Sequence, residues 1–222
     1  MTSTRTSRVE EAYLDLRQRI VTGSFAPGAP LSESELARKS HLSRTPIREA
    51  LCRLVEEGYV ERIPGRGFHV ARITMKLIQD TFEVRRLLEG QAAACAAERH
   101  DAPMLLRLRQ LAPLPAPIGE EGRRAARETN ALFHMAVAEA SGNSLLIELV
   151  QHCLDQVDRF MAHGIRLQTV ASETTAEHIE IVDAVGRRDT AAAGQAMERH
   201  LDVCRSQFMQ ALVRGERHDI AV

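Results

Sequence analysis

The feature that most constrains the fold is the stretch HLSRTPIREALCRLVEEGYVERIPGRGFHV, residues 41–70, which predicts one helix followed by a tight hairpin. Apolar residues recur at helical spacing up to Gly58, a residue type favoured just past a helix end. After it, YVERI and FHVAR alternate apolar and polar residues with the strand period and flank PGRG, a turn sequence. A helix that leads directly into a short hairpin leaves few folds open.

Two further helices are predicted before this stretch. Apolar residues recur at helical spacing over residues 9–21, and TGSFAPGAP then interrupts the helix. Ser32 can cap the next helix, because Glu35 stands three positions later and completes a capping box. Ser43 is the N-cap candidate of the third helix. Three helices and a hairpin within residues 8–73 predict a winged helix-turn-helix domain.

The rest of the chain has helical periodicity throughout. Aromatic residues make up 4% of the sequence and tryptophan is absent, so the core depends on aliphatic residues and Met, which suit helices. Alternating apolar stripes and short breaks predict an antiparallel bundle over residues 74–213, followed by a tail at 214–222. Its helices are expected at residues 76–99, 103–112, 123–141, 144–167, 175–185 and 190–212. The predicted fold class is therefore mainly α, with the winged domain first and the helical bundle second.

Charge and cysteine usage indicate where the protein works. The net charge of −1 divides into +3 up to Ile73 and −4 after it, which suggests different partners for the two halves. The N-terminus lacks the apolar segment of a signal peptide, and no apolar run approaches the roughly 18 residues that a membrane span needs. Cys52, Cys95, Cys153 and Cys204 form no CxxC pair, which predicts buried thiols in a reducing compartment. We expect a cytoplasmic protein.

The third helix begins with basic residues, although the dipole of a helix favours anions at that end. Phosphates of a DNA duplex would resolve this placement, because a recognition helix presents its N-terminal residues to the major groove. Arg44 and Arg48 share one helix face, and a guanidinium can bind guanine O6 and N7 together. Ser43 and Thr45 suit phosphate oxygens, and Arg66 at the hairpin tip can reach the backbone or the minor groove. For the arginine pair alone, a merely solvated helix face is the alternative.

The helical half offers a possible metal site. Asn130 and His134 are four residues apart and so share one helix face. His178 and His200 lie on consecutive helices at heights that differ by roughly 4–5 Å, so an antiparallel pair can point both at one spot. Three imidazoles and an amide oxygen can hold a divalent transition metal, zinc or a similar ion, with open positions. Taken singly, each His is more simply explained as a packed core residue.

The segment PGAPLSESELARKSHLSRTPIREALCRLVEEGYVERIPGRGFHV closely resembles the DNA-binding domain of the GntR family of bacterial transcription regulators. SRTPIREAL followed by EEGYVERIPGRG is a long and specific signature. The resemblance implies operator contacts by Arg44, Thr45 and Arg48, and a wing that approaches the groove at Gly67. Arg38, on the preceding helix, is a weaker candidate for a phosphate contact.

Residues 74–213 resemble the all-helical effector domain of the FadR subgroup, the FCD domain. The matching segments are FEVRRLLEGQAAACAAER, NALFHMAVAEASGNSLL and EHIEIVDAVGRRDTAAAGQAMERHL. Many members bind a metal through Asp-x-x-x-His and two later His, which implies Asn130, His134, His178 and His200 as ligands here. Asn130 departs from the usual Asp. A neutral amide is a weaker ligand, so we expect lower affinity and a more positive site that favours an anionic effector.

Arg85 matches the first-helix arginine of this family and is the candidate effector-binding residue. With Glu89 it can instead form an i, i+4 surface pair. If it faces inward, its planar fork suits a carboxylate. The resemblance implies small carboxylic acids, such as sugar acids, as effectors rather than fatty acyl-CoA.

The sequence therefore predicts a homodimeric regulator, most often a repressor in this family, that binds a pseudo-palindromic operator and responds to a small organic acid at a metal site. Two alternatives stay open. The ion itself can be the signal, or the three His can hold a catalytic metal in a hydrolase joined to a DNA anchor. No general base is placed beside the cluster, so the expectation is that the protein is not an enzyme.

Overall fold

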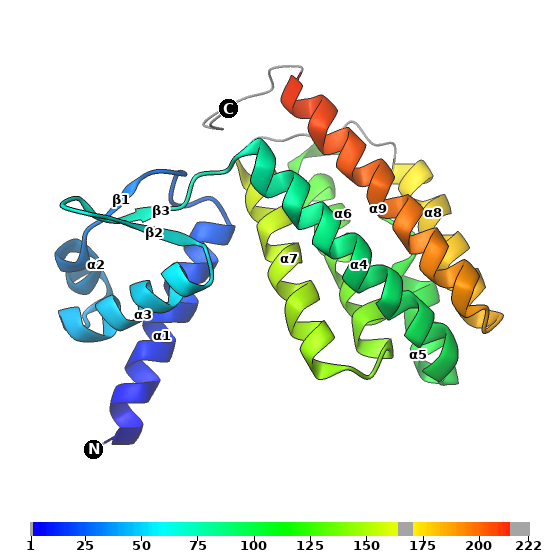
Figure 1. The fold of residues 1–222 in the computed structure, drawn as a ribbon, viewed down its shortest axis with the longest axis horizontal. Helices are drawn as coiled ribbons and strands as arrows, with labels where there is room; N and C mark the ends of the chain where they lie inside the picture. The colour runs from blue at the N-terminus through cyan, green and yellow to red at the C-terminus, as the bar shows by residue number, and fades with distance from the viewer. Residues whose placement is uncertain (1, 164–170, 214–222) are drawn as a thin grey trace. The chain divides into compact units, whose positions relative to one another are not determined.

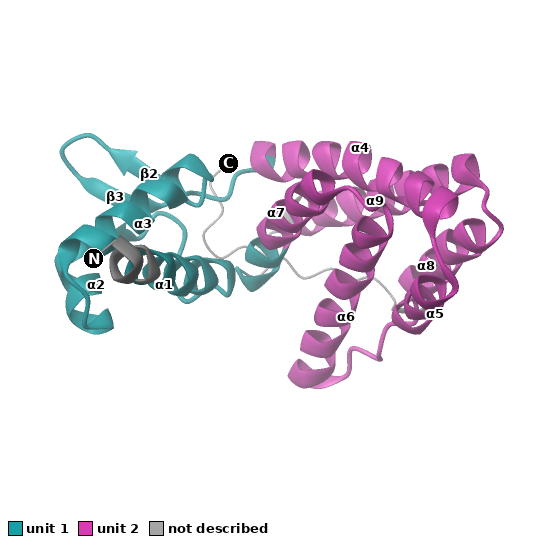
Figure 2. Cartoon of the chain, turned by 90° about the horizontal axis from the view of Figure 1, so that it is seen from below, with its two compact units in different colours: residues 1–75, 158–165, 217–222 teal, residues 76–157, 166–216 magenta. Residues whose placement is uncertain are grey.

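The structure is a computed structural model that describes residues 2–163 and 171–213. These residues form two compact units, one made of residues up to Met75 together with 158–163, and the other of 76–157 with 171–213 (Figure 2). The predicted fold class is confirmed, because a small unit with three helices and a wing precedes a unit made of helices. None of the described helices is both long and apolar enough to span a membrane.

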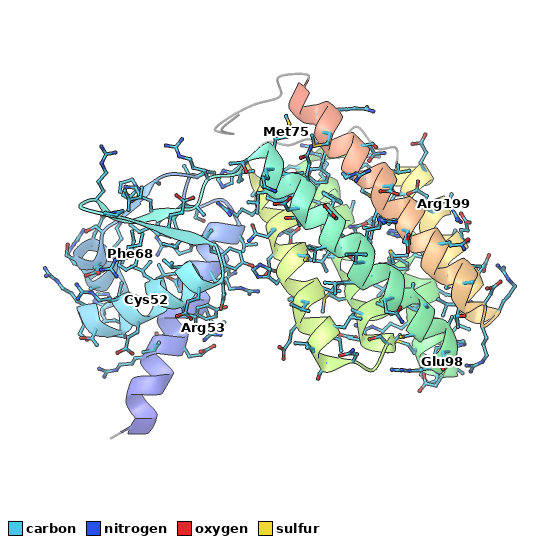
Figure 3. The ribbon with its side chains drawn as sticks, in the orientation of Figure 1. Cys52, Arg53, Phe68, Met75, Glu98 and Arg199 are labelled. Carbon is cyan, nitrogen blue, oxygen red and sulfur yellow. The ribbon has the colours of Figure 1, made fainter. Side chains whose placement is uncertain are left out.

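The first unit is a winged helix-turn-helix (Figure 1). Its core is a single apolar cluster in which Ile20, Leu51 and Tyr59 are fully buried. Figure 3 marks Phe68 on the hairpin, and its ring is also buried in this cluster. The elements are α1 (Thr2–Val21), β1 (Pro30–Leu31), α2 (Glu33–Ser40), α3 (Arg44–Glu56), β2 (Val60–Ile63) and β3 (Gly67–Val70).

The local signals in the sequence position these elements largely as predicted. The Ser32 side chain accepts a hydrogen bond from the Glu35 N–H and caps α2. Gly58 follows α3 with a φ of 76°, a conformation in which glycine has no Cβ penalty. The three-stranded antiparallel sheet has the order β1-β3-β2. Strand β1 was not predicted, because two residues are too few to display a strand period.

The second unit is an antiparallel bundle built from α4 to α9. Its elements are α4 (Met75–Arg99), α5 (Ala102–Leu111), α6 (Gly119–Ala140), α7 (Ser144–Ala162), α8 (Ala171–Gly186) and α9 (Thr190–Val213). Asp101 and Asp189 accept backbone N–H groups and cap α5 and α9. Helix α6 begins at Gly119, four residues before its predicted start. The end of the helix predicted at 144–167 and the tail at 214–222 lie outside the described residues.

Small residues let α4 and α9 approach each other closely at Gly90 and Gly194. A Cβ built on Gly194 would lie 3.2 Å from the Gly90 carbonyl oxygen, and one built on Gly90 would lie 2.9 Å from the Glu198 Cγ. A side chain at Gly194 would therefore press on the α4 backbone, whereas one at Gly90 would have to displace the Glu198 side chain. The close approach matters for the site, because Glu89 and His200 belong to these same two helices.

Candidate functional site

The predicted DNA-contacting residues of α3 lie on the outside of the first unit. Ser43, Arg44, Thr45 and Arg48 are exposed, whereas the opposite face of the helix is buried. Ser43 is the N-cap residue, yet its hydroxyl makes no capping hydrogen bond. The hydroxyl and the N–H groups of the first turn are thus able to meet an anion. The buried residues of α3 are Pro46, Ile47, Ala50, Leu51 and Leu54.

Arg48 is held by an acidic partner on α2. Its Nε and Nη2 donate to the two carboxylate oxygens of Glu33 at 2.9 and 2.8 Å. The hydrogen bond from Arg48 lowers the pKa of Glu33, and the charges of Arg44 and Arg62 lower it further. Three cations thus surround one carboxylate. This part of the surface keeps an excess of positive charge, as contact with a phosphate backbone requires.

The remaining predicted DNA contacts flank α3. Arg38 is exposed in the last turn of α2. The wing tip turns tightly, because the Arg66 N–H donates to the Ile63 carbonyl at 3.0 Å. Gly65 and Gly67 have φ values of 74° and 81°, which other residues rarely adopt, and Arg66 is exposed between them. The tip therefore presents one guanidinium on a narrow turn.

The three His that the sequence singled out come together in the second unit. His134 (α6), His178 (α8) and His200 (α9) are buried, and one ring nitrogen of each lies within 4.8 Å of the others. The Nε2 atoms of His134 and His200 are 3.3 Å apart. Two imidazole nitrogens on one tetrahedral zinc ion lie about 3.3 Å apart, given Zn–N distances of roughly 2.0–2.1 Å. The spacing therefore fits a shared ion.

Each imidazole is oriented through its other nitrogen. The Nδ1 of His134 lies 2.5 Å from a Glu89 oxygen, and the Nδ1 of His200 lies 2.7 Å from a Glu177 oxygen. The Nδ1 of His178 donates to the Ala112 carbonyl at 3.2 Å. Acceptors at all three Nδ1 atoms place the protons there and turn the Nε2 atoms toward the cluster centre. This is the outer-shell arrangement of protein metal sites.

The Nε2 of His178 differs from the other ring nitrogens of the cluster. It is buried and has no hydrogen-bond partner within the described part of the chain. Phe133 stacks on the His178 ring with centroids 3.9 Å apart and an interplanar angle of 15°. The ring is therefore fixed in place while its Nε2 lone pair stays unused, which is costly for a buried polar atom unless a ligand binds it.

A buried ion pair supports the cluster from α4. The Arg85 Nε donates to Glu89 at 2.6 Å, and both side chains are almost fully buried, 3% and 1% exposed. Burial alone would raise the pKa of Glu89, but the charges of Arg85 and His134 outweigh it and lower the pKa to about 2. The predicted i, i+4 pair thus forms, but in the interior rather than at the surface. The Arg85 Nη2 has no hydrogen-bond partner within the described residues.

The protonation of the three His differs. Burial lowers the pKa of His134 to about 4 against the pull of Glu89, and burial together with the charges of His200 and His134 lowers the pKa of His178. Burial also opposes a charge on His200, but Cys204 and Glu177 outweigh it and raise its pKa. His134 and His178 are therefore neutral at pH 7, the form in which an imidazole binds a metal.

The predicted ligand Asn130 lies one turn before His134 and is half-buried. Among the described residues, no hydrogen bond joins it to the three His.

The expectation of buried cysteines was wrong for most of them, because Cys153 alone is buried, Cys52 is exposed and the other two are half-buried. Sequence reasoning also missed Glu177 and the role of Glu89 toward His134, although Glu177 stands directly before His178.

Both units match known families. The FCD domain family matches residues 80–203, and the family described as bacterial regulatory proteins, gntR family, matches residues 8–70. The chain belongs to the GntR family. It is a DNA-binding transcriptional regulator of the GntR type with an FCD domain, and this family consists of regulators rather than enzymes.

Full-length relatives agree with this assignment. The chain is 32% identical over 213 residues to an HTH-type transcriptional regulator in an unstable DNA locus of Streptomyces ambofaciens, covering 90% of this chain and 84% of the relative. It is 28% identical to the HTH-type transcriptional repressor RspR of Escherichia coli K12, covering 95% and 92%. A GntR regulator structure from Rhodococcus sp. RHA1 has a TM-score of 0.72 at 25% identity, covering 92% and 99%. Escherichia coli McbR/YncC shares the fold, with a TM-score of 0.74 at 21% identity, covering 92% and 98%.

Proposed function

We propose that this GntR regulator is a homodimeric, cytoplasmic repressor whose operator binding is controlled by a small carboxylate effector bound at a divalent transition metal. The observation that carries the metal site is the convergence of three imidazoles whose Nδ1 atoms all have acceptors. Such fixed and buried donors are what a metal ion selects, and among the described residues the Nε2 of His178 has no hydrogen-bond partner.

The residues proposed to hold the ion are His134, His178 and His200, with Asn130 as the fourth ligand that the family resemblance implies. Imidazole ligands favour zinc and its neighbours among the divalent metals. With these neutral ligands, the ion would keep its full positive charge and would act as a Lewis acid toward a carboxylate oxygen.

Arg85 is the proposed second anchor for the effector. Its Nη2 is buried without a hydrogen-bond partner in the described residues, although its Nε binds Glu89. A carboxylate oxygen would satisfy this donor with a charge-assisted hydrogen bond. A small organic acid that bridges the metal and Arg85 therefore fits the chemistry better than a neutral ligand does.

On DNA, two winged units would bind the half-sites of a pseudo-palindromic operator. We propose residues 8–73 as the DNA-binding domain, 74–213 as the effector and dimerisation domain, and 214–222 as a tail. The effector acts by shifting the population between arrangements of the two DNA-binding domains. The size of this shift is limited by how much the affinity of the effector differs between the arrangements. The residues proposed to contact DNA are Arg38, Ser43, Arg44, Thr45, Arg48, Arg66 and Gly67.

Two observations support the homodimeric repressor. Exposed apolar residues stand at helical spacing on α4 (Val84 and Leu87) and on α7 (Leu145 and Leu149), as expected for a helix–helix interface. RspR and GlaR of Escherichia coli K12, which are similar to this chain over 86% or more of its length, are named repressors.

The alternative is that the ion itself is the signal. The three imidazoles are 0–1% exposed, and such an enclosed cluster favours an ion over a larger molecule. Operator affinity measured with zinc alone, organic acids alone and both together separates the two functions. We expect citrate, lactate or gluconate to change the affinity only in the zinc-loaded protein. An effect of zinc that no acid modifies would favour the ion as signal, and no effect of either would refute the proposal.

A further inference from the structure

Helix α9 carries a second ligand-type side chain beside the cluster. Cys204 follows His200 by four residues, so both lie on one face of the helix. Its Sγ lies 3.7 Å from the Nε2 of His200, the nitrogen that points to the cluster centre. Figure 3 marks Arg199, the residue before His200, on the outside of α9, where it is 58% exposed. His200 is 1% exposed and Cys204 is half-buried, so the face that carries them is the inner one.

We propose that Cys204 is the fourth protein ligand of the metal ion, in the place that the family resemblance gives to Asn130, and that it makes the site selective for a thiophilic ion such as zinc. The inference rests on the proposed metal site and deepens it. In forming the bond, the thiol releases its proton to solvent and the thiolate sulfur binds the ion, without any change of oxidation state.

The distances agree with a tetrahedral centre. With Zn–S about 2.3 Å and Zn–N about 2.0–2.1 Å, a sulfur and a nitrogen on one ion lie roughly 3.5 Å apart. The observed distance of 3.7 Å between the Cys204 Sγ and the His200 Nε2 is close to this value. The 3.3 Å between the Nε2 atoms of His134 and His200 likewise matches the separation expected for two nitrogens on one zinc ion. The sulfur does not belong to the group of ligand atoms that lie within 4.8 Å of one another, so the Cys204 side chain would have to rotate to reach an ion bound by all three His.

An independent observation indicates that a ligand belongs here. The His178 Nε2 is buried, 0% of the residue is exposed, and the atom has no partner in the described residues. It faces the same centre as the nitrogen that Cys204 contacts. An ion at this centre would satisfy His178 and engage Cys204 at once.

Charge also favours a thiolate at this position. As metal ligands the three imidazoles and Asn130 would all be neutral, so a thiolate would be the only anionic ligand. It would offset part of the charge of the divalent ion and leave a net positive site for a carboxylate. Soft sulfur ligands select zinc over magnesium, calcium and manganese. Because zinc can expand to five ligands, a position for a carboxylate remains.

Cobalt(II) is the probe that tests this, because a thiolate bound to cobalt gives a charge-transfer band in the near ultraviolet and imidazole ligands do not. We expect the band in the wild type, in Cys95→Ser and in Asn130→Ala, and its loss in Cys204→Ser. We also expect Cys204→Ser to lower the affinity for zinc. The loss should exceed the factor of about 10 to 100 that is typical when an outer-shell partner is removed. Cys95 is the matched control, since it is also half-buried in the second unit.

The outcomes separate the inference from the site on which it rests. Cobalt binding by the wild type without the band, or a band that survives in Cys204→Ser, would overturn the cysteine ligand and leave the His site standing. No cobalt or zinc binding by the wild type would overturn both. X-ray absorption of the zinc-loaded wild type gives a reading that depends on no variant: one sulfur in the coordination shell supports the inference, and nitrogen and oxygen alone refute it.

Discussion

Two arginine–glutamate pairs, one in each unit, have nearly the same chemistry and opposite surroundings. Arg48 and Glu33 lie at the surface of the winged unit, with side chains 65% and 20% exposed. Arg85 and Glu89 lie inside the bundle, at 3% and 1%. Water screens the first pair and not the second, so the first is easily exchanged for another partner while the second is fixed.

The difference matches the roles of the two units. On a DNA-binding surface the guanidinium must be oriented by its carboxylate and still be accessible to bases or phosphates, and the exposed pair allows that. The proposed effector site must hold its donors in one geometry, and the buried pair does so because Glu89 also binds the Nδ1 of His134. The same kind of ion pair thus orients a guanidinium in one unit and the imidazole of His134, a proposed metal ligand, in the other.

The largest expected effect comes from breaking the buried pair. Glu89→Gln leaves the Arg85 charge buried without its counter-ion, and we expect the free energy of unfolding to fall by about 3–5 kcal/mol. Urea denaturation with a chelator present measures this without a contribution from metal. Glu33→Gln is the matched control and should change stability little. Equal effects of the two variants would mean that burial does not distinguish the pairs.

Acid should weaken the bundle through the same carboxylate. The pKa of Glu89 is lowered from 4.5 to about 2 in the folded protein. The stability this provides is fully present above pH 4.5 and is lost as the pH falls from there toward 2. Urea denaturation of the chelated wild type and of Glu89→Gln across this range gives the test. The stability difference between the two proteins should shrink toward low pH, and a constant difference would contradict the assignment.

Arg44→Ala and Arg48→Ala address the other region. Each should lower the preference for operator over unrelated DNA by roughly 5- to 150-fold, since a bidentate contact to guanine is lost. Fluorescence anisotropy at fixed salt measures both affinities. The circular dichroism spectrum should not change, because both side chains are exposed. Unchanged selectivity in both variants would refute the recognition-helix assignment.

The smallest effect is expected for Glu33→Gln on DNA. The variant removes the carboxylate that orients Arg48, so affinity for any duplex should rise slightly while selectivity falls. The salt dependence of binding separates the effect of charge from that of orientation. The added net positive charge makes the affinity fall more steeply with salt, whereas the lost orientation of Arg48 leaves this slope unchanged. A gain in selectivity would show that Glu33 competes with the operator rather than orienting Arg48.

The sequence predicted the helices well because their signals are local. Ser32, Gly58 and Asp189 act on neighbouring backbone groups, and the apolar stripes report the packed faces directly. Strand β1 was missed because it depends on pairing with β3, far along the chain. Local spacing therefore suffices for most elements, and distant pairing does not follow from it.

The geometry of the candidate site was likewise predictable only where it depends on local spacing. The heights of His178 and His200 along two adjacent helices were predictable, and their ring centroids indeed lie 4.8 Å apart. The contact of Glu89 with His134 depends on how α4 and α6 pack, which spacing along one segment does not show. The position of Cys204 beside His200 does follow from their four-residue spacing on α9, and the sequence analysis did not use it.

The central claim is that the His cluster of the bundle governs DNA binding by the winged unit. Operator affinity of the wild type and of His178→Ala, each measured with zinc and with a chelator in the presence of the organic acid that acts most strongly on the wild type, tests it most directly. The account predicts that the wild type responds to zinc and that His178→Ala binds the operator with one affinity in both conditions. An equal response of both proteins would contradict it.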